Sequence, residues 1–152
     1  MPIIEQRLAS QVVGNIGLYL VCYRLSRLGW NVMPTARNAR GIDLLAYTAD
    51  ALCVRTIQVK SLSRRNAVPL GGSLDSLLAQ FVVVCRYVTR DDPECFVMTT
   101  REVRERAVRN EKDGKEMYWL GPTAYEETCF RERWSRIGKR PPRHRALSPR
   151  AG

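Results

Sequence analysis

The chain has 152 residues, which is enough for one domain with a hydrophobic core. Its hydrophobic content of 45% and charged content of 26% are ordinary for a globular protein and argue against a disordered chain. The net charge of +10 predicts a polyanionic partner, with nucleic acid favoured over an acidic membrane surface. No apolar run approaches the roughly 20 residues that span a bilayer, so we expect no membrane segment.

Five cysteines and one histidine narrow the chemistry further. The odd number of cysteines, with no CxxC spacing, favours reduced residues of a cytoplasmic protein over a disulfide framework. The histidine, His144, lies in a segment rich in proline and arginine, which argues against a zinc site and against acid–base catalysis by histidine. The N-terminal sequence lacks a basic region followed by a long apolar core, so we expect no secretory signal.

The first predicted element is a helix. Apolar residues at three- and four-residue steps predict a helix over about 11–28, with Ser10 as its N-cap and Gly29 as its stop. Two glycines inside this pattern, Gly14 and Gly17, predict that the helix closely approaches a strand or loop.

Three strands are expected next. Residues 30–33 are typical of a short strand that is ended by Pro34. The apolar segments 41–47 and 54–61 predict a β-hairpin, with its turn at Asp50 and Ala51.

Asp43, Gln58 and Lys60 interrupt the apolar runs of this hairpin. A turn at 50–51 pairs residue 47 with 54 and residue 43 with 58, so Asp43 and Gln58 would have Cβ atoms about 5 Å apart. Gln58 and Lys60 are two residues apart and therefore share a face of the strand. Such groups are seldom buried without partners, so their presence between apolar neighbours needs an explanation, and a functional site is one. Two other interpretations stay open: a hairpin face in contact with water, and a buried salt bridge in a structural or interaction protein.

The second half of the chain predicts further strands and helices. In order, we expect a turn-rich segment through 62–72, a short helical turn within 73–80, a central strand at 81–88, a buried strand at 95–98, a helix over about 101–110 that begins with a capping box of Thr99 and Glu102, a turn at 112–115, a strand at 117–120 and a last helix over about 123–137. The sequence thus predicts an α/β fold, with a mixed central β-sheet flanked by helices.

The domain boundary is expected at residue 137. Residues 138–152 contain three prolines, five basic residues and no acid, which predicts a disordered basic tail. Residues 1–137 are then the single folded domain.

Four segments together resemble the PD-(D/E)XK nuclease superfamily. They are the helix with Gly14 and Gly17, Gly-Trp-Asn-Val at 29–32, Gly-Ile-Asp-Leu at 41–44 and Ile-Gln-Val-Lys-Ser at 57–61. The resemblance covers about residues 11–100 and is closest to variants in which glutamine replaces the second acid, as in Mrr-type restriction enzymes. The chain is also similar to archaeal Holliday-junction-resolvase-like proteins. This resemblance implies a restriction-endonuclease-like core of order αβββαβ.

The resemblance also implies roles for the hairpin residues. Asp43 matches the metal-binding aspartate, Gln58 the second acidic position and Lys60 the catalytic lysine. Magnesium, or manganese in its place, would be held by Asp43, by the side-chain oxygen of Gln58 and by the backbone carbonyl of Val59. Lys60 would hold the attacking water and offset charge in the transition state, and the reaction would be hydrolysis of DNA phosphodiester bonds.

Four arginines near the cluster are predicted to contact nucleic-acid phosphates without reading sequence: Arg37, Arg40, Arg64 and Arg65. Cleavage of both strands commonly needs two sites, which a two-fold homodimer would supply.

The sequence departs from the family pattern at two positions. Gln58 removes one carboxylate, and Leu18 stands where many relatives have a glutamate after the second helical glycine. Fewer carboxylates favour an alternative function, a catalytically silent nucleic-acid-binding relative of the same fold. Whether the chain is an enzyme is therefore left open by the sequence.

Overall fold

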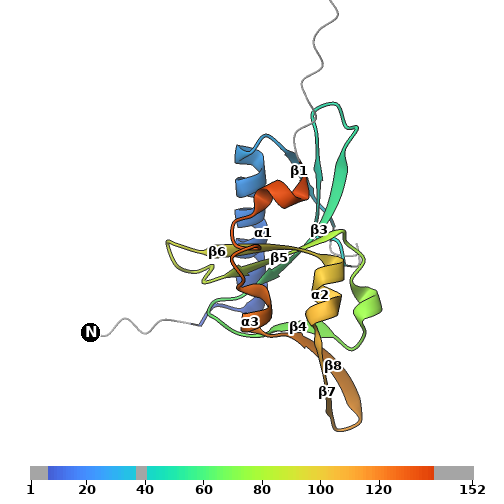
Figure 1. Cartoon of the computed structure of the whole chain (residues 1–152). Coiled ribbons are helices and arrows are strands. Elements are labelled where there is room, and N and C mark those ends of the chain that lie inside the picture. Colours follow the sequence, from blue (N-terminus) through green and yellow to red (C-terminus); the bar gives the residue numbers. More distant parts are fainter. Residues whose placement is uncertain (1–6, 37–40, 139–152) are drawn as a thin grey trace, which may run out of the picture.

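The computed structural model describes residues 7–36 and 41–138 (Figure 1). In chain order its elements are α1 (Ser10–Arg27), β1 (Asn31–Pro34), β2 (Leu44–Tyr47), β3 (Val54–Ser61), β4 (Val68–Gly71), the 3-10 helix η1 (Leu74–Ser76), β5 (Phe81–Arg86), β6 (Glu94–Thr99), α2 (Thr100–Arg106), β7 (Val108–Lys112), β8 (Lys115–Leu120), α3 (Pro122–Tyr125) and the 3-10 helix η2 (Trp134–Ile137). Apart from Gly138, the predicted tail 138–152 lies outside the described residues.

A five-stranded mixed sheet forms the centre of the molecule. Its strand order is β1-β2-β3-β5-β6, and a second sheet has the order β4-β8-β7. Within the five-stranded sheet, β3 and β5 are parallel and the other neighbouring pairs are antiparallel. The predicted α/β fold with a mixed sheet and flanking helices is therefore confirmed.

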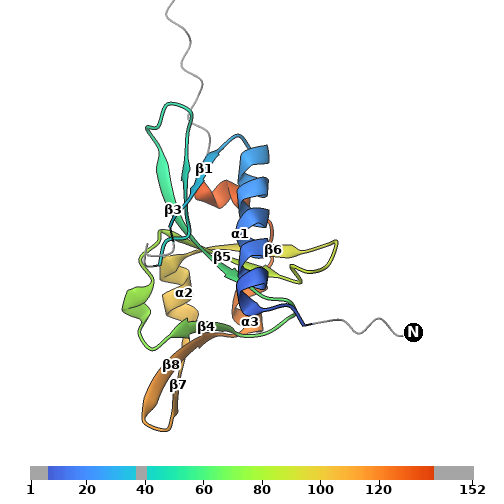
Figure 2. The same ribbon diagram turned by 180° about the vertical axis from the view of Figure 1, so that it is seen from behind.

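The central sheet is covered on both faces. Side chains alternate along β5, so Val83 and Cys85 pack in a core with α1, while Val82 and Val84 pack in a core with α2 and the second sheet. Figures 1 and 2 show α1 on one side of the sheet and α2 and α3 on the other. The continuous apolar run at 81–88 thus contains a central strand buried from both sides, as predicted.

The ends of α1 differ in how well the sequence predicts them. The N-cap is Ala9, whose carbonyl accepts hydrogen bonds from Val12 and Val13 at 2.9 and 3.1 Å, so the prediction of Ser10 as N-cap is wrong. At the other end, Gly29 has φ 91° and donates its N–H to the Ser26 carbonyl, as expected of the predicted stop.

Within the described ranges, no helix combines the length and apolar character that crossing a bilayer requires.

The predicted helix over 101–110 is too long. The capping box of Thr99 and Glu102 is present, but α2 ends at Arg106 and β7 begins at Val108. Asp113 and Gly114 have φ values of 54° and 75° and form the two-residue turn between β7 and β8. An aspartate followed by a glycine favours a tight hairpin turn. The first strand of this hairpin, β7, includes residues 108–110, which were predicted to be helical.

Two further segments differ from the prediction. The expected helix over 123–137 is broken between α3 and η2, because residues 130–132 form backbone hydrogen bonds with β6. The turn-rich segment contains β4, an edge strand paired with β8. Pro69 is tolerated there because an edge strand has one side without ladder hydrogen bonds.

Gly17 allows α1 to lie directly against the end of β3. A Cβ atom built at this position would lie 1.8 Å from Ser61 Oγ and 2.7 Å from Ser61 Cβ. The Ser61 hydroxyl donates a hydrogen bond to the Gly14 carbonyl at 3.4 Å. The predicted close approach of this helix to a strand is therefore confirmed at Gly17, whereas Gly14 has open space beside its Cα.

A buried arginine joins the β5–β6 pair to α3. Arg86 is 8% exposed, and its guanidinium donates to Glu94 and Glu126, both at 2.5 Å. Arg65 also donates two hydrogen bonds to Glu126, at 2.9 and 2.7 Å. These bonds, first from Arg65 and then from Arg86, lower the pKa of Glu126 to about 2.

We predict that Gly17→Ala and Gly14→Ala change stability in opposite directions. The methyl group at position 17 would collide with Ser61 and should destabilise the fold by about 1–3 kcal/mol. At position 14 the methyl group meets nothing and should stabilise the helix by about 0.5–1 kcal/mol. Urea unfolding monitored by circular dichroism measures both, and equal effects would contradict the close packing of α1 on β3.

We also predict that Glu126 makes stability depend on pH. Its pKa of about 2 in the folded state lies below the roughly 4.3 of a free glutamate, so its contribution is complete above pH ~4.3 and is lost as the pH falls towards 2. The stability difference between the wild type and Glu126→Gln should therefore shrink over this range in urea unfolding. Glu105→Gln, which breaks only the exposed pair with Arg101, should show a small difference at every pH.

Candidate functional site

The β2–β3 hairpin brings Asp43 against the strand that carries Gln58 and Lys60. Leu44 pairs with Ile57 and Tyr47 with Val54, which is the register predicted from the sequence. Asp43 precedes β2, and its N–H donates to the carbonyl of Ile57, the residue that pairs with Leu44, at 2.9 Å. The carbonyl of Asp43 accepts a hydrogen bond from the Thr35 N–H at 2.9 Å. The backbone of Asp43 is thus held on both sides.

The carboxylate of Asp43 is fixed against β3. Its Oδ2 accepts a hydrogen bond from the Val59 N–H at 2.7 Å, and the side chain is half-buried. A charge-assisted bond of this kind is stronger than one between neutral groups. Val59 therefore positions the acid through its N–H, between the two other residues of the predicted cluster.

Gln58 carries a buried oxygen that lacks a partner. Its Oε1 is inaccessible to solvent and accepts no hydrogen bond from any described residue. An unsatisfied buried acceptor costs about 1–3 kcal/mol, so most such atoms in folded proteins are paired. The neighbouring Thr56, on the same face of β3, exchanges two hydrogen bonds with Gln80. Thr56 and Gln58 thus lie on one polar face of β3. The hydrogen bonds of Thr56 are made, whereas the side-chain oxygen of Gln58 has none.

Lys60 lies on the same face, among apolar neighbours. In the parallel ladder it pairs with Val84, and Gln58 pairs with Val82. Burial lowers the pKa of Lys60 below its ordinary value, and the negative charge of Asp43 opposes part of that decrease. The structure thus brings Asp43, Gln58 and Lys60 together on one face of the hairpin. It is the face opposite α1, because Ile57 and Val59 point into the core that contains α1.

The donor set fits a cation that prefers oxygen. No group of three or more His, Cys, Asp or Glu side chains gathers anywhere in residues 7–36 and 41–138. The cluster instead offers one carboxylate and the unpaired amide oxygen of Gln58. Magnesium takes oxygen ligands and keeps several waters, so it suits a site with few protein ligands. Leu18 stands where the family resemblance would place a glutamate on the first helix, and it packs against the core on the α1 side.

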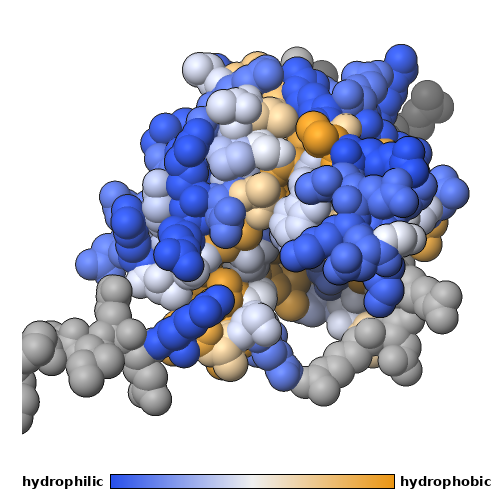
Figure 3. Space-filling model, turned by 90° about the horizontal axis from the view of Figure 1, so that it is seen from below, coloured by the Kyte–Doolittle hydropathy of each residue, from blue (hydrophilic) through white to orange (hydrophobic). Residues whose placement is uncertain are grey.

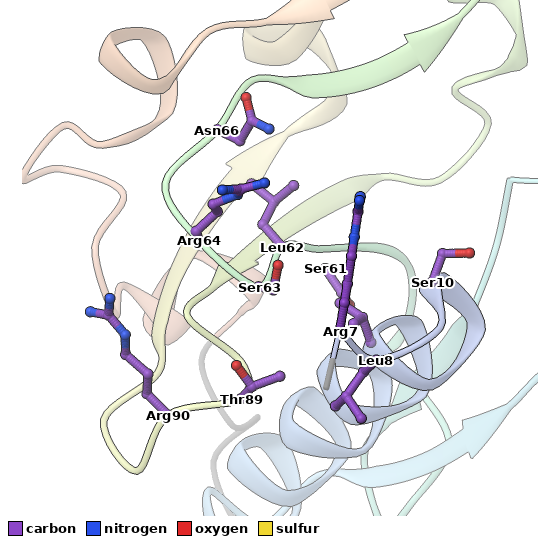
Figure 4. Close-up of a pocket in the computed structure, with 11 residues that line it drawn as sticks. Arg7, Leu8, Ser10, Ser61, Leu62, Ser63, Arg64, Asn66, Thr89 and Arg90 are labelled. Atoms are coloured by element: carbon purple, nitrogen blue, oxygen red, sulfur yellow. The ribbon is translucent and has the colours of Figure 1, made fainter. Parts of the chain in front are cut away.

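The four predicted phosphate-contacting arginines have different surroundings. Arg37 and Arg40 lie outside the described residues. Arg65 is paired with Glu126 in the ion network around Arg86. Arg64 is exposed and lines a cavity of about 770 Å³ between the start of α1 and the loops that follow β3 and β5 (Figure 4).

Two basic residues of this cavity, Arg7 and Arg90, were not predicted as functional. Each is a single arginine in a polar segment, far in sequence from the hairpin, and no local motif distinguishes it from other surface arginines. Their proximity to Arg64 follows from the tertiary fold.

Comparisons with known proteins give a fold relative. A scan against protein-family models finds no match, and a search of curated proteins finds none. Among solved structures, the chain is similar to a bacterial homing endonuclease, I-Ssp6803I, with a TM-score of 0.57 at 16% identity. The superposition covers 86% of this chain and 93% of that chain. At this level of identity the similarity concerns the fold.

We predict that Gln58→Met makes the protein more stable. The substitution replaces the unpaired amide with an apolar side chain of similar length, and removing the buried unsatisfied oxygen should add about 1 kcal/mol. The matched control is Gln80→Met, which removes an amide oxygen that accepts the Thr56 N–H at 3.1 Å and should cost about 0.5–1.5 kcal/mol. Chemical denaturation measures both. A loss of stability at position 58 would mean that its oxygen has a partner in solution.

Proposed function

We propose that the chain is a metal-dependent endonuclease-like protein that hydrolyses DNA phosphodiester bonds at the Asp43–Gln58–Lys60 cluster. The observation that carries the proposal is the buried, unpaired Oε1 of Gln58 beside a fixed carboxylate and a half-buried lysine. A protein retains such an arrangement at a cost in stability when a ligand completes it.

Each residue of the cluster has a distinct role in this chemistry. Asp43 and Gln58 would hold magnesium, or manganese, with the Val59 carbonyl as a further backbone ligand. The bound ion would supply Lewis acidity and a polarised water. Lys60 would hold that water by hydrogen bonding and offset the negative charge that grows on the phosphoryl oxygens. The hydrogen bond from the Val59 N–H keeps Asp43 in one orientation, which lowers the reorganisation needed on binding.

Two other observations support a nucleic-acid substrate. The chain carries a net charge of +10, which favours association with a polyanion. The fold resembles that of a protein described as a homing endonuclease. DNA is the substrate that we propose on this basis, and a two-fold dimer would supply a second site for the opposite strand.

A second candidate function is a catalytically silent nucleic-acid-binding protein. It is favoured by the small number of acids at the cluster. Within the described residues, no three His, Cys, Asp or Glu side chains lie together where they could hold a metal ion. Binding alone, however, gives no reason for a lysine to be half-buried beside an aspartate. The two functions differ in whether the protein cleaves DNA when a divalent metal ion is added.

The proposed activity is tested by incubating the protein with plasmid and branched DNA in magnesium or manganese. We expect Asp43→Asn to reduce cleavage by at least about 100-fold, since even residues that only orient a metal ligand cost 10–100-fold when changed. Gln58→Glu should lower the magnesium concentration needed for half-maximal cleavage, because it restores a second carboxylate. Asp113→Asn is the charge-matched control, because it lies in the β7–β8 turn, where asparagine is equally suited.

The outcomes separate the two functions. Cleavage that is lost in Asp43→Asn and kept in Asp113→Asn supports the nuclease. An absence of cleavage by the wild type and by Gln58→Glu, with salt-dependent DNA binding intact, would favour the silent binding protein.

A further inference from the structure

The cavity lined by Arg64 lies where two parallel strands end. Its walls come from the start of α1, from the loop after β3 and from the loop after β5 (Figure 4). β3 and β5 are parallel, so their carboxyl ends meet at the same edge of the sheet. In open sheets with parallel strands, ligands characteristically bind in the crevice beyond these ends. Figure 3 shows the molecule from below, the side on which α1 begins, with hydrophilic residues flanking a hollow.

The lining of the cavity is basic. Arg7, Arg64 and Arg90 contribute three guanidinium groups, and none of the lining residues is acidic. None of the three forms an ion pair with any residue in the described part of the chain. In Figure 4, Arg7 and Arg64 stand on opposite sides of the opening. Three uncompensated positive charges around one concave surface favour an anionic ligand.

Hydroxyl groups and the start of a helix add donors to this surface. Ser10, Ser63 and Thr89 line the cavity with the arginines. No side chain caps this 18-residue helix at Ala9, and its first turn contains no acidic residue. The partial positive charge of the helix dipole at this end is therefore not offset by a side chain of the first turn. Phosphate oxygens accept hydrogen bonds from all these groups.

Backbone hydrogen bonds join the two loops that line the cavity. The Leu62 N–H donates to the Cys85 carbonyl at 2.7 Å, and the Val88 N–H donates to the Leu62 carbonyl at 3.2 Å. These bonds tie the loop after β3 to the loop after β5. The Arg90 guanidinium lies 4.1 Å from the centre of the Tyr87 ring, which restricts its orientation. A preformed basic surface binds with a smaller entropic cost than one that must be ordered by its ligand.

We infer that this cavity binds a phosphate group of a nucleic-acid strand. The inference rests on the proposed function. Ser61, which lines the cavity, directly follows Lys60, but consecutive side chains of a strand point to opposite faces, so the cavity opens on the α1 side of the sheet and the cluster on the other side. The ligand is either a backbone phosphodiester or a terminal phosphate monoester, because both present the same oxygens.

Binding without metal tests this inference separately from cleavage. The full chain is titrated with fluorescent single-stranded oligonucleotides, with and without a 5′-phosphate, in EDTA, and anisotropy is recorded at several salt concentrations. The test variant is Arg7→Gln/Arg64→Gln/Arg90→Gln. The control is Arg27→Gln/Arg101→Gln/Arg133→Gln, which removes the same charge from exposed positions outside the cavity. Circular dichroism establishes that both variants are folded.

We expect the cavity variant to lose at least about tenfold in affinity relative to the control. The slope of log affinity against log salt should fall by about 2, because each lost phosphate contact on a single strand removes ~0.7. A preference for the 5′-phosphorylated oligonucleotide that the cavity variant abolishes would identify a terminal phosphate. Equal affinity for both oligonucleotides, with the same loss in the variant, would identify a backbone phosphate.

Equal losses in the cavity and control variants would overturn the inference, because they would reflect net charge alone. An absence of cleavage together with cavity-dependent binding would refute the hydrolytic function and leave the phosphate site standing.

Discussion

The register between β2 and β3 is the constraint on which the rest of the molecule depends. The N–H of Asp43 donates to the Ile57 carbonyl, and the carboxylate of the same residue accepts a hydrogen bond from the Val59 N–H. A slip of one residue would turn every side chain of the strand to the other face, which would dissolve both the core and the polar cluster. The acid is therefore positioned by the hydrogen bonds that define the sheet, and the candidate site needs no flexible loop to assemble it.

β3 divides its residues between packing and polar chemistry. Ile57 and Val59 point into the α1 core, and Ser61 meets the glycine face of that helix, while the intervening positions carry the polar groups. The strand alternates in this way over residues 56–61. Its last residue also borders the basic cavity, so one strand connects the polar cluster to a surface suited to phosphate. Changes in the packing of α1 against β3 would consequently be felt at both places.

Much of the fold could be predicted from the sequence, because several signals are local. Helical periodicity predicted α1, apolar runs predicted the central strands, and a turn at Asp50 and Ala51 gave the hairpin register. The errors arose where distant contacts decide the structure: hydrogen bonds to β6 break the expected last helix, and pairing with β8 makes a strand of a segment with Pro69. The basic cavity follows the same rule, because Arg7 and Arg90 acquire a meaning only when the fold brings them beside Arg64.

The contact between residues 130–132 and β6 has a consequence for association between copies of the chain. Val97 donates to the Phe130 carbonyl and Glu132 donates to the Cys95 carbonyl, so this edge of the five-stranded sheet is already occupied. The other edge is β1, four residues long and ending in Pro34, which has no N–H to offer a further strand. Growth of this sheet by strand addition is thus blocked at one edge and poor at the other, which protects a highly apolar sheet from amyloid-like stacking.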